Sequence, residues 1–487
     1  MTNFPARREV KFSFSLLGVR MRCHMYVVVL IAFITASTVA EMDPIASGGR
    51  FVIPALAAYL AGSVAIGSLR SALSLRAMPA GGQPMRAAFA RHNIMSLAAN
   101  AWLVAGLAGL VLLGYGQWVM KGLGLQDVPL VGEALLMAPF IAAMIVTWLL
   151  EYRFYRVAKG RIIYQQTLMG LVPRRPWSLR EFIGYNLRHQ FLFVAVPIGL
   201  ILLVRDTLDL FKARLGETAV FVGSTVGAVV VVLIAPTLIV RIWRTVRMPA
   251  GPLRDELTKV SRAMRLRFRQ LLVWRTGGMI ANAAVMGILA PVRYVLLSDA
   301  LLEQLDGREV RAVFAHEAGH IVGHHLFYAM LFSISSVILC TSAGELLAWR
   351  LRLDGWWAES LVISLLAVVW LLGFGWISRR FERQSDVVAA WYSADGGPSP
   401  DGRLSPEGAY TFSRSLERIA ELNGIAQGQW NWRHGSIGGR VAYVMWLGST
   451  AGNRGDADKP VRRIKAGLWA ATALSAAAIA ARVVFNF

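Results

Sequence analysis

The sequence predicts a mostly α-helical protein that crosses a membrane several times, and three observations lead to this fold class. Hydrophobic residues make up 56% of the 487 residues and charged residues only 16%, whereas about a quarter of the residues in soluble globular domains are charged. The apolar residues gather in runs of near-spanning length. Lys and Arg flank these runs and do not form one basic stripe, so the net charge of +22 does not indicate nucleic-acid binding.

Eight apolar runs are long enough to predict membrane spans. They lie at about 24–40, 51–69, 95–120, 132–150, 190–204, 219–242, 326–349 and 358–377. An Ala-rich run at 466–485 is a weaker ninth candidate, because alanine adds little transfer free energy. The first run ends in TASTVA and also resembles a signal peptide, but the 23 residues before it make an unusually long n-region.

The distribution of Lys and Arg predicts how these spans are oriented. The connections 1–23, 69–94 and 151–189 carry five, four and eight basic residues, whereas 41–50, 121–131, 205–218 and 350–357 carry one, one, three and two. Rich and poor connections alternate, as the positive-inside rule requires. We therefore expect the N-terminus and the segments 243–325 and 378–465 to face the cytosol.

The segment HEAGH carries the strongest chemical signal in the sequence. His316 and His320 are four residues apart, so on a helix they lie on one face and can bind one metal ion through two imidazoles. Glu317 can take a proton from water at that ion. The alternative to a metal site is that the two histidines are hydrogen-bonded residues of a buried helix and bind no metal.

A zinc hydrolase also needs a third protein ligand. The two predicted spans after His320 return the chain to the side of the membrane on which His320 lies, so residues after 378 can reach the metal. The first acidic residue there is Glu382, and Asp386 follows one helical turn later. Two carboxylates at this spacing among arginines also occur on solvated helix faces.

Several segments in 253–445 resemble the integral-membrane CaaX prenyl protease and HtpX-type metalloendopeptidases. FERQSDVVAA is similar to the E-x-x-x-D motif that follows the HExxH helix and a transmembrane hairpin in that family. The segment from IANAAVMG to AHEAGH resembles the family's N-A-x-x-x-G strand, second strand and pre-catalytic helix. RHGSIGGRVAYV resembles its H-P-S-x-x-x-R-I segment, with Gly435 in place of proline.

The resemblance implies a role for each matching residue. His316, His320 and Glu382 would bind one Zn²⁺ ion, and Glu317 would be the general base. Asp386 would hold a ligand imidazole. His434 and Arg440, the histidine and arginine of the RHGSIGGRVAYV segment, would stabilise the oxyanion or brace the metal group.

The apolar segment 279–286 lies between glycines and predicts an edge strand, whose unpaired backbone groups can pair with an extended peptide. The family uses this strand in that way, so Asn282 is the predicted substrate-binding residue; a structural Asn beside a turn is the alternative. His324 and His325 follow the metal motif at the start of a span and are expected to be interfacial polar residues.

These observations give a predicted domain organisation. Residues 1–242 form an N-terminal membrane region of about six helices, and 243–325 a cytosolic segment with a pre-catalytic helix, the edge strand and the HExxH helix. A transmembrane hairpin (326–377), a cytosolic segment with the third ligand (378–465) and a candidate C-terminal span (466–487) follow. The fold class is thus a polytopic helical membrane protein with a cytosolic zincin-like catalytic region that contains a small β-hairpin or sheet.

The predicted function is that of a membrane-embedded zinc metalloendopeptidase. Its partners would be the lipid bilayer and membrane-associated protein or peptide substrates, and its location a bacterial inner membrane with the active site facing the cytosol. The substrates would be damaged membrane proteins or, as the second class, a C-terminal peptide of the prenyl-protein kind. A non-catalytic scaffold or transporter with a structural zinc is the rival, but a structural zinc has four protein ligands and no need of Glu317. The oligomeric state is not predicted.

Overall fold

Helices dominate the computed structural model of the protein, as the sequence predicts. The structure describes residues 25–40, 50–78, 86–125, 128–168, 175–278, 280–351, 356–395, 397–423, 425–450 and 452–485. The chain forms two units, which are called the N-terminal and the C-terminal unit below. The first comprises Met1–Thr245 and Trp274–Met279, and the second comprises Val246–Val273 and Ile280–Phe487.

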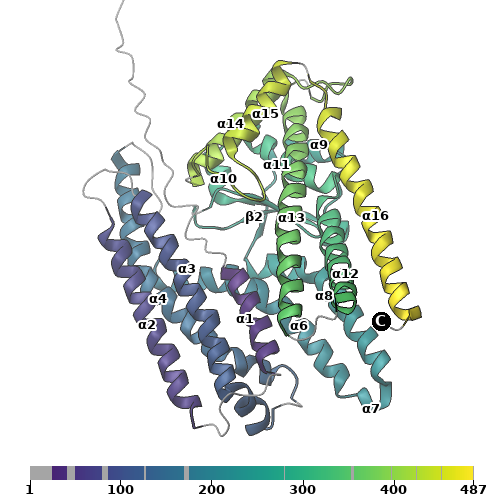
Figure 1. The fold of residues 1–487 in the computed structure, drawn as a ribbon. Coiled ribbons are helices and arrows are strands. Elements are labelled where there is room, and N and C mark those ends of the chain that lie inside the picture. Colours follow the sequence, from purple (N-terminus) through teal and green to yellow (C-terminus); the bar gives the residue numbers. More distant parts are fainter. Residues whose placement is uncertain are drawn as a thin grey trace, which may run out of the picture. The chain divides into compact units, whose positions relative to one another are not determined.

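The N-terminal unit is built from helices (Figure 1). They are α1 (Met25–Ala40), α2 (Val52–Arg76), α3 (Arg86–Leu110), α4 (Val131–Leu168), α5 (Leu179–Asn186), α6 (Leu192–Asp209), α7 (Lys212–Leu215) and α8 (Glu217–Ile242). Wider helical turns at Val111–Tyr115 and Trp118–Gly122 follow α3, and another at Leu187–Phe191 joins α5 to α6. α2 packs against both α3 and α4, and α6 packs against α8.

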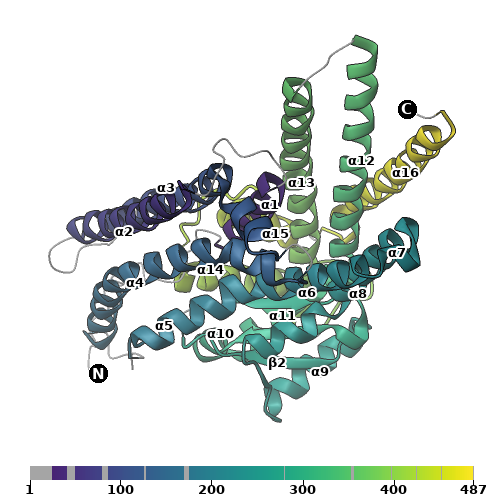
Figure 2. The same ribbon diagram turned by 90° about the horizontal axis from the view of Figure 1, so that it is seen from below.

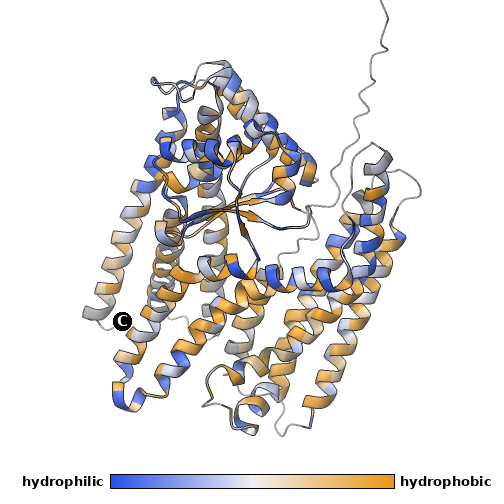
Figure 3. Cartoon of the chain, turned by 180° about the vertical axis from the view of Figure 1, so that it is seen from behind, coloured by the Kyte–Doolittle hydropathy of each residue, from blue (hydrophilic) through white to orange (hydrophobic). Residues whose placement is uncertain are grey.

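Seven helices in the described part of the chain are long and apolar enough to cross a membrane. They are Val52–Arg76, Arg91–Tyr115, Val131–Arg161, Leu179–Asp209, Glu217–Ile242, His325–Leu347 and Gly455–Ala481. Six of the eight predicted runs and the weaker ninth run fall in these helices. The run 24–40 forms the shorter α1, and the run 358–377 lies in a helix whose side chains are partly outside the described residues. Figure 3 shows the long stretches of hydrophobic residues on the helices.

A buried polar network joins three of the membrane helices of the N-terminal unit. Arg70 on α2 contacts Glu151 on α4 at 3.1 Å, and His92 on α3 contacts the same carboxylate at 3.2 Å. All three side chains are buried. Arg70 falls in the predicted connection 69–94, but α2 continues to Arg76, so Arg70 lies inside the helix and has its partner there. A charged residue inside a membrane helix is costly unless it is paired in this way.

The C-terminal unit contains a small four-stranded sheet, in the order β1-β2-β4-β3. Its strands are β1 (Val246–Arg247), β2 (Gln270–Trp274), β3 (Ala283–Met286) and β4 (Tyr294–Ser298). β3 pairs with β4 in antiparallel register, from Ala283 opposite Leu297 to Met286 opposite Tyr294. β3 is thus an edge strand, which confirms the predicted sheet, but it begins at Ala283 and is shorter than the predicted 279–286.

Helices make up the rest of the C-terminal unit. They are α9 (Pro252–Ala263), α10 (Asp299–Gln304), α11 (Gly307–Val322), α12 (His325–Leu351), α13 (Trp356–Ser393), α14 (Pro406–Asn423), α15 (Ile437–Ser449) and α16 (Gly455–Phe485). α12 and α13 form the predicted helical hairpin, and α16 packs alongside both (Figures 1 and 2). α13 continues without a break past residue 377, so one helix connects the predicted span to Glu382 and Asp386.

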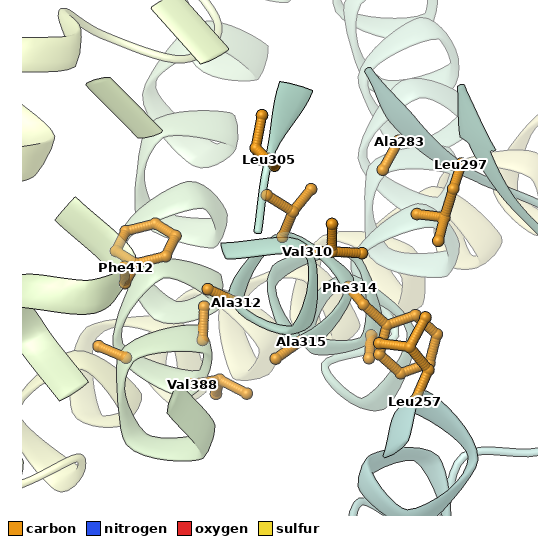
Figure 4. Close-up of a cluster of buried hydrophobic side chains, with 14 of the residues drawn as sticks. Leu257, Ala283, Leu297, Leu305, Val310, Ala312, Phe314, Ala315, Val388 and Phe412 are labelled. Atoms are coloured by element: carbon orange, nitrogen blue, oxygen red, sulfur yellow. The ribbon is translucent and has the colours of Figure 1, made fainter. Parts of the chain in front are cut away.

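α11 lies at the centre of the hydrophobic core of this unit (Figure 4). Its own apolar side chains pack against those of neighbouring elements. Figure 4 labels Val310, Ala312, Phe314 and Ala315 of α11 and, around them, Leu257, Ala283, Leu297, Leu305, Val388 and Phe412. Gly319 brings α11 close to α13, because a Cβ atom at this position would lie 3.1 Å from the Ser385 Cα. This close approach brings the histidines of α11 next to the carboxylates of α13.

Candidate metal centre

The HExxH segment lies in the second half of α11, whose start is fixed by a capping box. The Asp306 side chain accepts a hydrogen bond from the Glu309 N–H at 2.9 Å, and the Glu309 side chain accepts one from the Asp306 N–H at 3.0 Å. Such reciprocal bonds satisfy free N–H groups at the start of a helix. The helix continues to Val322, so His316 and His320 lie one turn apart on one face.

His316, His320 and Glu382 form the one cluster in the described residues whose donor atoms could hold a metal ion. One atom from each residue lies within 4.8 Å of the others. The two Nε2 atoms are 3.3 Å apart, and each lies 3.6 Å from a carboxylate oxygen of Glu382. The structure therefore brings together the three residues that the sequence predicts as ligands.

The spacing of these atoms fits zinc. Zn–N and Zn–O bonds are about 2.0–2.2 Å long, so two donors of one tetrahedral ion lie about 3.3–3.6 Å apart. Two imidazoles and one carboxylate are also a ligand set that catalytic zinc sites use, with the fourth position left open. Both the chemistry and the separation of the donors thus suit a catalytic zinc ion.

Asp386 and Arg440 lie directly behind the ligands. Asp386 Oδ1 is 3.0 Å from His316 Nδ1, although the ring N–H is not well aligned with it. Arg440 donates two hydrogen bonds to Asp386, at 2.8 and 2.5 Å, and lies 3.2 Å from Glu382. The Arg440 guanidinium is buried and committed to these two carboxylates.

These contacts set the charge of the cluster. Burial raises the pKa of Glu382 and of Asp386, but the positive charge of Arg440 and the contacts with nearby histidines together outweigh burial. The pKa of both carboxyls is therefore below its usual value. Burial lowers the pKa of His316, whereas the contact with Asp386 raises it, and the net shift is upward. For His320, burial dominates and lowers the pKa to about 4, so this imidazole is neutral and able to bind a metal at neutral pH.

Glu317 is half-buried beside the cluster. Burial raises its pKa to about 7, the negative charge of Glu382 contributes in the same direction, and the neighbouring cationic groups oppose the shift. A carboxyl with a pKa near neutrality can both accept and return a proton at physiological pH, which is what a general base requires.

His434 and Asn282 lie in loops, and His434 contacts the cluster. His434 follows a turn after α14, and its Nδ1 is 2.8 Å from Glu382 Oε1; its side chain is 43% exposed. Asn282 lies one residue before β3, and its backbone N–H donates to the Ser298 hydroxyl at 2.9 Å. The edge of β3 that faces away from β4 pairs with no strand in the described residues.

His325 also lies beside this cluster, which the sequence does not predict. His325 was expected to be an interfacial polar residue, but it is only 4% exposed and its Nδ1 lies 2.9 Å from His320 Nδ1. The reason is the turn at Gly323 and His324, where His324 has φ of 54°. This turn leaves His324 exposed and brings His325 next to His320.

Comparisons with known proteins match part of this chain to a protein family. Residues 249–426 match the sequence profile of peptidase family M48. Among solved structures, the crystal structure of S. mikatae Ste24p is similar, with 15% sequence identity and a TM-score of 0.46, and the match covers 80% of this chain and 99% of that one. No curated protein sequence matches this one.

The M48 match includes the HExxH helix, the following hairpin and the Glu382 segment. Peptidases of this family are zinc-dependent metalloendopeptidases. The apolar helices on both sides of the catalytic segments make the protein multi-pass. Residues 249–426 therefore match peptidase family M48, a family of metalloproteases, and the chain that carries this segment has helices long and apolar enough to cross a membrane.

Proposed function

We propose that this protein is an endopeptidase that holds one zinc ion between His316, His320 and Glu382 and cleaves membrane or membrane-associated proteins on the cytosolic side of a bacterial inner membrane. The observation that carries the proposal is the convergence of three donor atoms within 4.8 Å, with Glu317 on the same helix as the two histidines. A structural zinc site would have four protein ligands, whereas the cluster in the described residues offers three.

The reaction requires a proton acceptor, a positive charge near the carbonyl oxygen and a fixed ligand set. Zinc, when bound, polarises the carbonyl and makes water a better nucleophile. Glu317 would take the proton of the attacking water and deliver it to the leaving amine. His434, on the exposed side of Glu382, would donate a hydrogen bond to the oxyanion that develops on the substrate.

Asp386 and Arg440 would act as positioning residues. Arg440 has two possible roles from the family resemblance, to stabilise the oxyanion or to brace the metal group, and the contacts of Arg440 favour the second. Its guanidinium is occupied by Asp386 and Glu382. Asp386 in turn would orient His316 so that Nε2 is available to the metal.

The substrate would bind as an extended strand along the outer edge of β3. Backbone groups of an edge strand can pair with a peptide in any sequence, which suits an endopeptidase with many substrates. Asn282, just before β3, would contact the peptide at the start of this edge.

Contacts of the His434 loop support an active site close to the membrane surface. Trp432 packs on Trp370 and Phe374 of α13, with ring centroids at 6.2 and 5.8 Å, and Arg379 donates to the Trp432 carbonyl at 2.6 Å. Trp370 and Phe374 belong to the predicted span 358–377, so the loop is attached to its end. Tryptophan and arginine are typical of membrane–water interfaces.

This location suits substrates that are themselves in or at the membrane. We favour damaged membrane proteins, cleaved for quality control, over a prenylated C-terminal peptide. A comparison of membrane proteomes from cells with active and inactivated enzyme would distinguish them, since quality control predicts that many membrane proteins accumulate and processing predicts one or a few.

The direct test of the activity uses the purified full-length protein and an unfolded casein-like substrate. We expect hydrolysis that a zinc chelator abolishes and that added Zn²⁺ restores. Hydrolysis that persists when the protein contains no zinc would contradict the proposal, and the Glu317→Gln protein is the control for a contaminating protease.

A further inference from the structure

A chain of hydrogen bonds leads from the back of His320 to α16. His325 Nδ1 lies 2.9 Å from His320 Nδ1, and His325 Nε2 lies 2.8 Å from Gln384 Oε1. Gln384 Nε2 then donates to Asp458 Oδ1 at 2.5 Å. The four side chains come from α11, α12, α13 and α16, so these hydrogen bonds join four helices of the C-terminal unit.

The chemistry of the last residue fixes the direction of every bond in this chain. A carboxylate can only accept hydrogen bonds, so the Asp458 carboxylate must face the NH₂ group of Gln384. The Gln384 carbonyl oxygen then faces His325 and requires a proton on His325 Nε2. A neutral imidazole has one donor and one acceptor, so His325 Nδ1 is an acceptor and takes its hydrogen bond from His320 Nδ1–H.

The consequence at His320 is a single tautomer. With its proton on Nδ1, the lone pair of His320 lies on Nε2, the atom that is 3.3 Å from His316 Nε2 and 3.6 Å from Glu382. The opposite tautomer would carry its proton toward the metal position and prevent binding.

The packing around His325 keeps these hydrogen-bonded side chains in place. The His325 ring stacks on Phe381 with a centroid distance of 4.2 Å and an interplanar angle of 2°. Lys465 of α16 donates to the Gly323 carbonyl at 2.7 Å and thereby holds the turn that precedes His325. The Ser385 hydroxyl lies 3.5 Å from His325 Nδ1 and, as a donor, is compatible with the same direction.

We propose that His325, Gln384 and Asp458 are positioning residues that fix the tautomer and orientation of His320 for zinc. This inference rests on the proposed zinc site. It adds Asp458 as a second carboxylate, after Asp386, that acts behind the proposed ligands. Asp386 contacts His316 directly, at 3.0 Å, whereas His320 reaches a carboxylate through two intervening side chains. Partners of this kind, placed behind a metal ligand, commonly change metal affinity by about 10–100-fold when they are removed.

The test measures zinc affinity by competition with a chelator in the purified full-length protein. His325→Phe preserves a ring that can stack on Phe381 but removes the acceptor for His320, and we expect zinc to bind about 10–100-fold more weakly. Gln384→Met leaves His325 in place but removes the group that sets its tautomer, and we expect a smaller but measurable loss. Asp458→Asn keeps an acceptor oxygen, so its zinc affinity should stay closest to that of the wild type.

The neighbouring His324→Asn is the matched control, because His324 is exposed and its left-handed backbone suits asparagine. It should leave zinc affinity unchanged. The absorption spectrum of the Co²⁺-substituted proteins provides a readout that a merely structural role would not change, since it reports the ligand geometry. We expect it to change in His325→Phe and Gln384→Met and to match the wild type in His324→Asn.

Wild-type zinc affinity in Gln384→Met would overturn the inference, and this variant decides the question if His325→Phe does not fold. Different results would show that the proposed function itself is wrong. If the wild-type protein binds no zinc, or if Glu382→Ala binds zinc as well as the wild type, the zinc site itself is wrong. If the wild type binds zinc through Glu382 and the His325 and Gln384 variants bind it equally well, only the hydrogen-bonded chain is wrong.

Discussion

Arg440 donates two hydrogen bonds to Asp386, at 2.8 and 2.5 Å, in the interior of the C-terminal unit. Both side chains are buried, and each charge is compensated in part by the other. Removing one partner of a buried ion pair leaves an uncompensated charge. This pair therefore connects the stability of the C-terminal unit to the arrangement of the proposed metal ligands.

Arg440→Leu should destabilise the protein by about 3–5 kcal/mol, since it leaves the Asp386 and Glu382 carboxylates without their cation. The measurement is the midpoint of thermal unfolding of zinc-free protein in detergent. Arg418→Leu is the matched control, because Arg418 is 44% exposed and contacts Glu421 at 3.5 Å; such exposed pairs contribute little to stability. Equal effects of the two substitutions would mean that the buried pair has no special role.

The orientation of the chain can be tested with reporter fusions. Fusions at 270, 400 and 430 should report the cytosol, because the segments that precede and follow the hairpin must share one side to form the zinc site. Fusions at 45 and 354, two positions outside the described residues, should report the opposite side. Opposite results at 270 and 400 would make the proposed zinc site impossible.

Glu382→Ala should abolish activity and sharply reduce the zinc content, whereas His324→Ala should leave both within a few-fold of the wild type. Glu382 lies 3.6 Å from each histidine Nε2, while the turn after α11 leaves His324 exposed. Zinc content by elemental analysis is the measurement. The ligand assignment fails if His324→Ala loses zinc and Glu382→Ala retains it.

His434→Phe should lower kcat and leave the zinc content near that of the wild type. His434 contacts Glu382 from the exposed side of the cluster, where a substrate carbonyl would bind, and it is not one of the three proposed ligands. Steady-state kinetics and zinc analysis on the same preparation separate the two effects. Loss of zinc would instead mean that His434 is needed to hold the metal site together.

Much of the fold could be predicted because its signals are local. Apolar runs predict the long helices, and the spacing of His316 and His320 predicts their common face. The Ala-rich run 466–485 was underestimated because hydropathy scales give alanine little weight, yet it forms part of the long helix α16. The strand near Asn282 was predicted too long, since the apolar pattern extends beyond the residues that pair with β4.

The surroundings of the metal site depend on contacts between distant residues, and such contacts leave little trace in a single sequence. Glu382 was proposed as a ligand only because the chain returns to the same side and because its segment resembles a known motif. His325 looked like an interfacial residue because it begins an apolar helix. Its burial depends on the turn at His324 and on Gln384 and Phe381 of α13, which no local pattern reveals.

In the proposed mechanism Glu317 is the base at a zinc ion that other residues hold, and the Glu317→Gln protein separates these two roles. Glutamine keeps the size and shape of the side chain but cannot take a proton from water. Zinc content and hydrolysis of the casein-like substrate are measured on the same preparation. We predict wild-type zinc content and a fall in hydrolysis by a factor of about 10² or more; hydrolysis at the wild-type rate, with zinc bound, would contradict the mechanism.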